Sequence, residues 1–258
     1  VIFAGLLIPL MVVTWMQVNH WKDGVTLWKH TIEVQPNMYP EFARAYNNLG
    51  FALKREGRFA DAITQYKTAI KINPEFSKPY NNLGNVLRKV NESDEAIVYF
   101  KEAIRVKPDN SLAYINLGSA MLYKGEMEEA ITHFRKAIKI SPDNALAYSN
   151  LGTTLAKTGK LEEAIIQFKE AIRVNPGLAM PHTNIGIALA QNGKSDEAIV
   201  HFRKAIGINP DYALAHFSLG NVLFQKGETQ EAVTHFREAV RLNPRFDLFR
   251  KTLEAALL

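Results

Sequence analysis

The chain is organised by pairs of apolar stripes that are separated by short polar turns. Within residues 43–76, apolar and small residues recur at the i, i+3, i+4, i+7 spacing of one helical face, twice in succession. The first stripe consists of Tyr46, Leu49, Gly50 and Leu53, and the second of Ala62, Tyr66, Ala69 and Ile70. Pro74 follows the second stripe, and the residue before a proline is disfavoured in the helical region. The pattern predicts a helix, a tight turn and a second helix.

This pattern returns every 34 residues. The closing proline recurs as Pro74, Pro108, Pro142, Pro176, Pro210 and Pro244. The glycine of the first helix recurs as Gly50, Gly84, Gly118, Gly152, Gly186 and Gly220. A fixed period of this length marks a stacked array in which each unit buries its apolar face against its neighbours. The units cover residues 43–76, 77–110, 111–144, 145–178, 179–212 and 213–246.

The sequence "AYNNLGFALKREGRFADAITQYKTAIKINP" resembles the tetratricopeptide repeat (TPR), and the resemblance covers residues 43–246. It implies an all-α, right-handed superhelical solenoid of helix–turn–helix units. It also implies a groove, lined by the first helix of each unit, that binds protein or peptide segments.

The first 20 residues depart from the repeat. Residues 1–18 carry no charge, and 19 to 21 helical residues cover about 30 Å, the thickness of the hydrocarbon layer of a bilayer. Trp15 and Trp21 are placed where indoles favour the interface. A basic start and a small-residue cleavage site, which a signal peptide requires, are not visible. The segment is predicted to be a membrane anchor or, alternatively, a buried packing helix.

Residues 21–42 are interpreted as a degenerate half repeat and a connector, with Trp28 at the aromatic position and Pro36 at the closing position. The apolar segment followed by "WKDGVTLWKHT" resembles the end of the membrane part of TPR-containing O-mannosyltransferase-like proteins. This resemblance implies that the repeats lie outside the cytoplasm, next to a membrane. It carries over no catalytic residue.

The last residues, 247–258, begin a seventh unit without a second helix, and we expect a capping helix there. This segment ends "EAALL", which is apolar for the outer face of a solenoid. Because the N-terminal segment is apolar as well, the two ends could stack head to tail, an arrangement that does not close and yields filaments.

Composition removes several classes of function. The 258 residues contain no cysteine, so disulfide scaffolds and thiolate chemistry are excluded. A net charge of +5, from 31 basic and 26 acidic residues, is too small and dispersed for a nucleic-acid-binding stripe. Phosphate-binding glycine loops and HExxH are missing from the sequence. We therefore expect a protein that is not an enzyme and needs no cofactor.

The histidines give no metal site by spacing alone. His133, His201 and His235 share one repeat position, and neighbouring units place such positions roughly 10 Å apart, too far for one ion. They are interpreted as surface residues of the second helices. His182 and His216 replace the tyrosine of other units and are expected to be partly buried packing residues.

The candidate binding site follows one position of the first helix. It recurs as Asn48, Asn82, Asn116, Asn150 and Asn184, followed by Ser218. An asparagine amide both donates and accepts hydrogen bonds, so a ladder of asparagines can pair with an extended peptide backbone. The helical region of O-linked N-acetylglucosamine transferases carries a similar ladder. The alternative is that these amides brace adjacent units, and the two interpretations are compatible.

The flanking positions change along the array. In the first two units they are basic: Arg44, Lys54, Arg55, Lys78, Arg88 and Lys89. In later units they are apolar: Leu112, Leu122, Leu146, Ala156, Met180, Ala190, Leu214 and Phe224. We expect a groove for a segment with acidic residues at one end and apolar residues at the other. Solvated charges and ordinary packing between helices are the alternative.

The sequence thus favours a non-catalytic interaction scaffold outside the cytoplasm. Two alternatives stay open, a filament that assembles through the solenoid ends and a substrate-positioning region of a membrane glycosyltransferase. The sequence Asn91-Glu-Ser93 is also an N-glycosylation signal, located at a turn.

Overall fold

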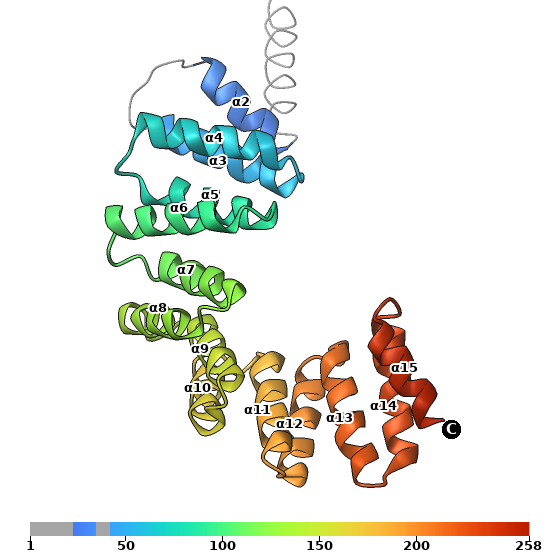
Figure 1. Ribbon diagram of the computed structural model, residues 1–258. Helices are drawn as coiled ribbons and strands as arrows, with labels where there is room; N and C mark the ends of the chain where they lie inside the picture. Colours follow the sequence, from blue (N-terminus) through green and yellow to red (C-terminus); the bar gives the residue numbers. More distant parts are fainter. Residues whose placement is uncertain (1–22, 35–41, 258) are drawn as a thin grey trace, which may run out of the picture. The chain divides into compact units, whose positions relative to one another are not determined.

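The structure, a computed structural model, describes residues 23–34 and 42–257, and this part of the chain is all-α (Figure 1). Fourteen helices, α2 to α15, follow one another in these residues. Consecutive helices pack as antiparallel pairs, which confirms the predicted solenoid of helix–turn–helix units. The chain divides into two compact parts that each contain several repeats, one ending at Lys124 and one beginning at Gly125. From here on they are called the first unit and the second unit, each is described by itself, and one helix–turn–helix element of 34 residues is called a repeat.

The first unit contains three first helices and three second helices of the repeat (Figure 1). They are α2 (Gly24–Val34), α3 (Phe42–Arg55), α4 (Phe59–Ile72), α5 (Ser77–Lys89), α6 (Ser93–Val106) and α7 (Ser111–Lys124). Helix α2 packs against α3, as a second helix packs against the first helix of the following repeat.

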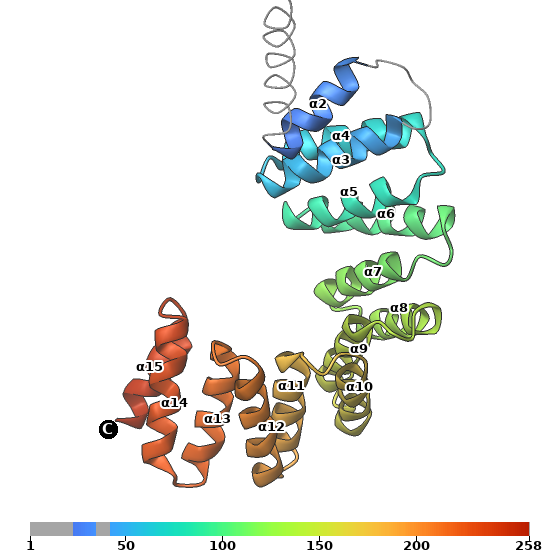
Figure 2. The same ribbon diagram turned by 180° about the vertical axis from the view of Figure 1, so that it is seen from behind.

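The second unit continues the same alternation, and Figure 2 shows its helix pairs from behind. They are α8 (Met127–Ile140), α9 (Ala145–Lys157), α10 (Leu161–Val174), α11 (Ala179–Gln191), α12 (Ser195–Ile208), α13 (Ala213–Gln225), α14 (Thr229–Leu242) and α15 (Asp247–Ala256). Helices α9 and α10, α11 and α12, and α13 and α14 form the pairs, and α15 covers α14.

Small residues let the two helices of a pair approach closely. In the first pair, Ala62 and Ala69 are fully buried, and the ring of Tyr66 lies against Gly50. A Cβ atom on Gly50 would come within 2.8 Å of Cε1 of Tyr66. The spacing seen in the sequence therefore reflects the contact between the helices.

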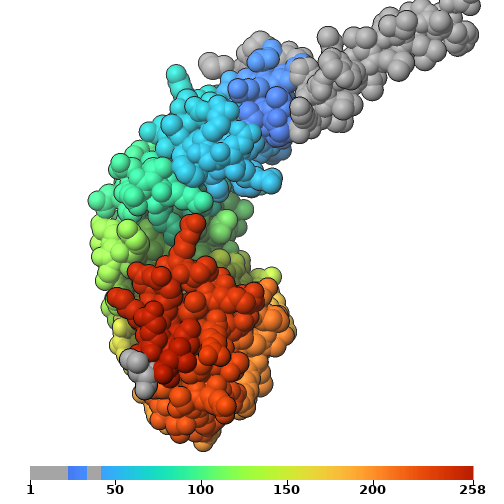
Figure 3. Space-filling view, turned by 90° about the vertical axis from the view of Figure 1, so that its right-hand side faces the viewer, coloured from blue at the N-terminus to red at the C-terminus, as the bar shows by residue number. Residues whose placement is uncertain are grey.

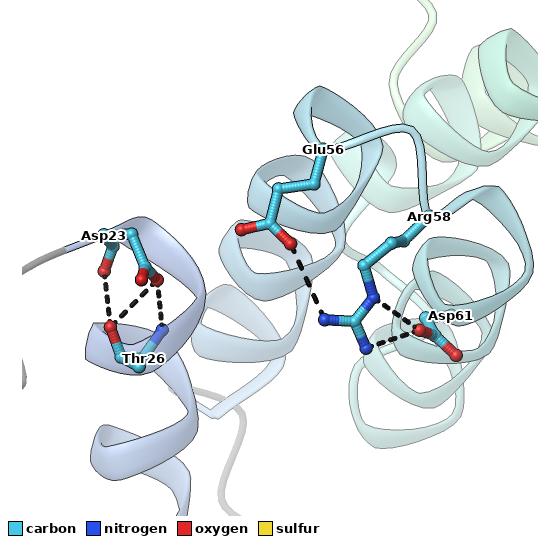
Figure 4. Close-up of polar contacts among 5 residues, drawn as sticks. All are labelled: Asp23, Thr26, Glu56, Arg58 and Asp61. Atoms are coloured by element: carbon cyan, nitrogen blue, oxygen red, sulfur yellow. Dashed lines mark hydrogen bonds and ion pairs between the residues drawn. The ribbon is translucent and has the colours of Figure 1, made fainter.

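Polar side chains fix the ends of the helices in the first unit (Figure 4). The Asp23 carboxylate accepts hydrogen bonds from the Thr26 amide and hydroxyl, each at 2.8 Å, and so caps the first turn of α2. At the turn between α3 and α4, the Arg58 guanidinium lies 2.6 Å from Asp61 and 3.6 Å from Glu56.

Helix α15 is the outermost layer at the end of the second unit, and Figure 3 looks onto it. Its buried anchor is Phe249, whose ring stacks on Phe217 with centroids 4.5 Å apart. Phe246, Leu248 and Leu257 stay exposed. The helix therefore closes the unit through one aromatic contact and leaves apolar side chains on the surface.

The predicted anchor or packing helix of residues 1–20 lies outside the described residues. Among the helices of residues 23–34 and 42–257, none combines the length and apolar character that crossing a bilayer requires.

Candidate protein-interaction site

Four basic residues gather at the carboxyl ends of two neighbouring first helices in the first unit. Lys54 and Arg55 stand in the last turn of α3, and Arg88 and Lys89 in the last turn of α5. Cations at this end of a helix interact favourably with the helix dipole. Burial and, after it, the charge of Lys89 lower the pKa of Lys54, so the cations are close enough to repel one another. We call these four residues the basic cluster.

The basic cluster is a surface feature with free charge. Arg55, Arg88 and Lys89 are exposed, as are Arg44 and Lys78 near the starts of the same helices. Within residues 23–34 and 42–257, no acidic side chain forms an ion pair with any of these five residues. The cluster can therefore accept an anionic partner without first breaking an ion pair.

The asparagine ladder of the first unit joins neighbouring repeats. The side-chain amide of Asn82 donates to Oδ1 of Asn47 at 2.9 Å, and that of Asn116 donates to Oδ1 of Asn81 at 2.8 Å. Asn47 and Asn81, the acceptors, are buried. Asn48, Asn82 and Asn116 lie on the first helices α3, α5 and α7. Asn82 and Asn116 each brace the first helix of the preceding repeat.

Bracing uses only part of each amide. Asn82 is half-buried and keeps a second N–H and its carbonyl oxygen for a ligand, whereas Asn116 is itself buried. In the second unit the interaction is weaker, because the Asn184 amide donates to Oγ1 of Thr153 at 3.4 Å. Asn150 and Asn184 are half-buried on α9 and α11.

Two cavities lie along the first helices of the second unit. The first has a volume of about 220 Å³ and lies between α9 and α11, and the second, of about 270 Å³, lies between α11 and α13. Thr153, Ala156, Lys157, Phe168, Asn184, Ile187, Ala188 and Gln191 line the first cavity. Ile187, Ala190, Gln191, Phe202, Ser218, Asn221, Val222 and Gln225 line the second cavity.

The second cavity repeats the first 34 residues further on, position by position. Phe202 replaces Phe168 at the floor, Ala190 replaces Ala156, and the amide of Gln191 has its counterpart in Gln225. Each cavity thus has an apolar floor and an amide-bearing rim. Such a combination suits an apolar side chain whose backbone hydrogen-bonds to the rim.

An exposed apolar row accompanies the cavities. Its members are the second residues of α9, α11, α13 and α15, which are Leu146, Met180, Leu214 and Leu248. Between 36% and 53% of each of these residues is exposed. Arg44 and Lys78 occupy the same repeat position in the first unit. The next residue at this position, Leu112 in α7, is apolar and 49% exposed. The position therefore offers charge on α3 and α5, and apolar surface on α7 and on the first helices of the second unit.

The histidines differ from the sequence interpretation. His201 and His235 are half-buried, and each faces the histidine of the preceding helix. The Nδ1 atoms of His182 and His201 are 3.2 Å apart, and those of His216 and His235 are 3.0 Å apart. The interpretation of His201 and His235 as surface residues was wrong, whereas the partly buried packing role of His182 and His216 is confirmed.

The sequence contained a signal for these pairs. In both pairs the two histidines are 19 residues apart, and the pairs occupy the same two positions of adjacent repeats. A comparison of one position between different repeats cannot reveal a contact between two positions of the same repeat. In the part of the chain that the structure describes, no group of three or more histidine and acidic side chains is placed to hold a metal ion.

Stacked helix pairs whose face is lined by apolar side chains and amides are typical of solenoid interaction proteins. Comparison of the sequence with known protein families shows to which family this chain belongs. The TPR repeat matches residues 52–91, 121–159, 152–193 and 186–227, and the tetratricopeptide repeat matches residues 77–110 and 213–246. The chain belongs to the tetratricopeptide repeat family. No curated protein sequence matches it. Repeats of this kind support a protein-interaction scaffold.

Solved structures with the same fold include three TPR proteins. The chain is 26% identical to YrrB, "a TPR protein with an unusual peptide-binding site", with a TM-score of 0.56 over 73% of this chain and 97% of that one. It is 28% identical to MamA, with a TM-score of 0.58 over 64% of this chain and 96% of that one. It also resembles a chain of the APC/C hetero-tetramer Cut9-Hcn1, at 19% identity and a TM-score of 0.76.

The match to Cut9-Hcn1 covers 90% of this chain but only 45% of the other. This chain therefore spans less than half the length of that relative, and at this identity the likeness shows the fold alone.

Proposed function

We propose that the protein is a scaffold that binds extended peptide segments on the faces of its first helices. The observation that carries this proposal is the pair of equivalent cavities in the second unit, each with an apolar floor and an amide rim. The similarity to YrrB, whose title describes a peptide-binding site, supports it. Asn150 and Asn184 are the proposed backbone partners there, and Asn48, Asn82 and Asn116 those of the first unit.

The spacing of the cavities restricts the ligand. Neighbouring packed helices lie about 10 Å apart, and a segment in the polyproline II conformation advances about 3.1 Å per residue with three residues per turn, so side chains three residues apart lie on the same side. Two apolar side chains three residues apart therefore reach both cavities together. On the first unit, Arg44, Arg55, Lys78, Arg88 and Lys89 are the proposed partners of acidic residues in a bound segment.

Filling the cavities tests the proposal. A fluorescent peptide with two leucines three residues apart is titrated against the wild-type chain and the Ala156→Phe and Ala190→Phe variants. We expect Ala156→Phe and Ala190→Phe each to weaken peptide binding at least tenfold, because the added ring occupies the space of a ligand side chain. Val200→Phe, on an exposed position of α12, is the control. Equal affinities for all four proteins would contradict the proposal.

We also propose that residues 1–20 attach the protein to a membrane, with the repeats outside the cytoplasm. The uncharged segment and its resemblance to O-mannosyltransferase-like membrane proteins support this, and a substrate-positioning role beside a glycosyltransferase would follow from the same resemblance. The chain contains no cysteine, so a single Ser111→Cys substitution in α7 provides a unique label. Labelling of intact cells by an impermeant maleimide is expected. Labelling only after lysis would contradict the proposed location.

Filament formation is the second candidate function, and the surface of α15 favours it. Leu248 in α15 and the two residues that flank this helix, Phe246 and Leu257, are each about half exposed. Leu248→Lys with Leu257→Lys should abolish any concentration-dependent assembly in sedimentation velocity. A wild-type chain that stays monomeric at the highest concentration tested would exclude this candidate.

A further inference from the structure

We propose that His216 and His235 form a two-ligand site for a divalent transition-metal ion such as Zn²⁺, bound through their Nδ1 atoms. Helix α13 provides His216, and α14 provides His235. Water or a side chain from an incoming partner completes the coordination. The site is separate from the peptide-binding face and does not depend on it.

The distance between the two nitrogen atoms suits a chelated ion. The Nδ1 atoms lie 3.0 Å apart. Zinc binds imidazole nitrogen at about 2.0–2.1 Å, so two nitrogens on one ion are about 2.9 Å apart at a right angle and about 3.4 Å apart at the tetrahedral angle. The observed separation lies between these values. The ring centroids are 5.2 Å apart, so the two Nδ1 atoms point toward each other, and both rings must rotate for their lone pairs to converge on one ion.

The outer nitrogen of His216 has the partner that metal-binding histidines require. Its Nε2 is 2.9 Å from the carbonyl oxygen of Pro210. A carbonyl only accepts hydrogen bonds, so Nε2 of His216 carries the proton and the neutral ring has a bare Nδ1. Ligating histidines commonly donate their other N–H to a backbone carbonyl or a carboxylate, which fixes this tautomer.

The outer nitrogen of His235 faces a carboxylate. Its Nε2 is 3.8 Å from Oε1 of Glu231, one turn earlier on α14. In the absence of a metal ion, one Nδ1 carries a proton and donates a hydrogen bond to the other at 3.0 Å, and because Nε2 of His216 is protonated the donor is His235. A metal ion takes the place of that shared proton. The proton of His235 then moves to Nε2, where the negative charge of Glu231 favours it.

The surrounding charges are mixed but include two carboxylates. Glu231 is paired with Arg203 at 2.9 Å, and Glu238, one turn after His235, is paired with Arg241. One fifth of the His235 side chain is exposed, which gives an ion access from solvent. The site therefore combines a close pair of nitrogens, nearby negative charge and an entry path.

The chain contains a matched comparison site. His182 and His201 hold the same repeat positions, with Nδ1 atoms 3.2 Å apart. Two lysines, Lys204 and Lys169, and one carboxylate, Glu197, act on His201, whereas one arginine, Arg203, and one carboxylate, Glu231, act on His235. The charges around the comparison site therefore disfavour a cation more. We therefore expect the first metal equivalent to bind at His216 and His235.

The test titrates ZnCl₂ into the full chain, free of any tag, by isothermal calorimetry at pH 7.5. The substituted residues are ones that other repeats carry at these positions. Four repeats have Tyr at the position of His216, and two repeats have Gln at the position of His235. His216→Tyr and His235→Gln are therefore expected to fold, as circular dichroism will verify. Each should weaken the tightest zinc event at least tenfold, and Glu231→Gln should weaken it about tenfold.

The same substitutions at the comparison site complete the test. His182→Tyr and His201→Gln should leave the tightest event unchanged within twofold. A wild-type chain that binds no zinc would overturn the proposal. So would a titration in which His235→Gln matches the wild type, or in which His201→Gln causes the larger loss.

Discussion

The ring of Phe202 lies directly against Gly186, in the space where any other residue would carry its Cβ atom. A Cβ built on Gly186 would be 2.5 Å from Cε1 of Phe202 and 2.8 Å from Cδ1. The ring is 1% exposed and is enclosed between α11 and α12, so it has little room to move. This contact sets the distance between the two helices of the pair.

Gly186→Ala should destabilise the protein, although alanine normally favours a helix. Alanine gains about 1 kcal/mol over glycine in a helix interior, whereas overpacking a core costs about 1–3 kcal/mol. We expect a net loss of about 1 kcal/mol, measured as a lower urea midpoint. Gly207→Ala in α12 is the control, because no atom lies within 4 Å of its added Cβ. It should raise the midpoint, and a rise for both variants would contradict the packing argument.

Tyr66→Phe should stabilise the first unit. Tyr66 is fully buried, and its hydroxyl has no hydrogen-bond partner among the described residues. Burial raises the pKa of this phenol, so the group stays neutral but unsatisfied. A buried unsatisfied polar group costs about 1–3 kcal/mol, and its removal should raise the melting temperature.

The equivalent residue in the next repeat provides the reciprocal test. Phe100 is also fully buried, and Phe100→Tyr should lower the melting temperature by a similar amount. If Phe100→Tyr is neutral, the cavity around these rings tolerates a hydroxyl, and the explanation for Tyr66 fails.

The sequence predicted the helix pairs because each repeat contacts its neighbours in the same way. Gly50 and Tyr66 meet across the first pair as Gly186 and Phe202 meet across a later one. A contact that recurs at a fixed interval leaves a fixed pattern of small and aromatic residues. The fold could therefore be predicted without knowing any distance.

The role of the asparagines could not be decided in this way. The amide of Asn82 can donate to a peptide or to a neighbouring helix, and both roles need the same residue at the same position. Its bond to Asn47 at 2.9 Å depends on the spacing of α3 and α5, which periodicity does not provide. The pairing of His216 with His235 was missed for a related reason, since it joins two different repeat positions.

Asn91→Ala should destabilise the turn between α5 and α6. Asn91 has a φ of 67°, in the left-handed region, and glycine occupies the equivalent turns, as at Gly57 with a φ of 78°. Asparagine tolerates this region, whereas a residue with an ordinary Cβ pays roughly 1–2 kcal/mol there. We expect a lower melting temperature for Asn91→Ala and little change for Asn91→Gly. Equal losses for both would indicate that the Asn91 side chain matters in another way.

Acid should weaken the second unit through His201. Burial, and then the neighbouring His182, lower the pKa of His201 to about 4, and Lys204 and Lys169 act in the same direction, with Glu197 opposing them. An unfolded histidine has a pKa of about 6.5 and takes up a proton first as the pH falls. This contribution to stability is therefore complete above about pH 7, is lost between 6.5 and 4, and changes no further below 4.

The measurement compares the wild type with His201→Gln, a residue that two other repeats carry at this position. The full difference in pKa corresponds to about 3 kcal/mol, and solvent screening of a half-buried ring reduces the expected effect to about 1 kcal/mol. The urea midpoint of the wild type should fall more between pH 7.5 and 4.5 than that of the variant. Parallel curves would exclude His201 as the source.

Reversing three charges of the basic cluster should weaken binding of an acidic peptide to the first unit. Arg55, Arg88 and Lys89 are exposed at the carboxyl ends of α3 and α5 and have no ion pair among the described residues. Their charges are available to a ligand, and the attraction should decrease as salt shortens the Debye length from about 30 Å at 0.01 M to about 10 Å at 0.1 M. For the triple change to Glu we expect at least a tenfold loss of affinity at low salt and no remaining salt dependence.

A control with the same change in net charge separates the cluster from general attraction. Lys71, Lys101 and Lys107 are exposed in α4, in α6 and directly after α6, away from the first helices. Changing these three residues to Glu should reduce affinity only slightly, since a local site depends on charges near the ligand and not on the total. If the two triple variants lose affinity equally, the peptide responds to net charge alone, and the basic cluster is not a binding site.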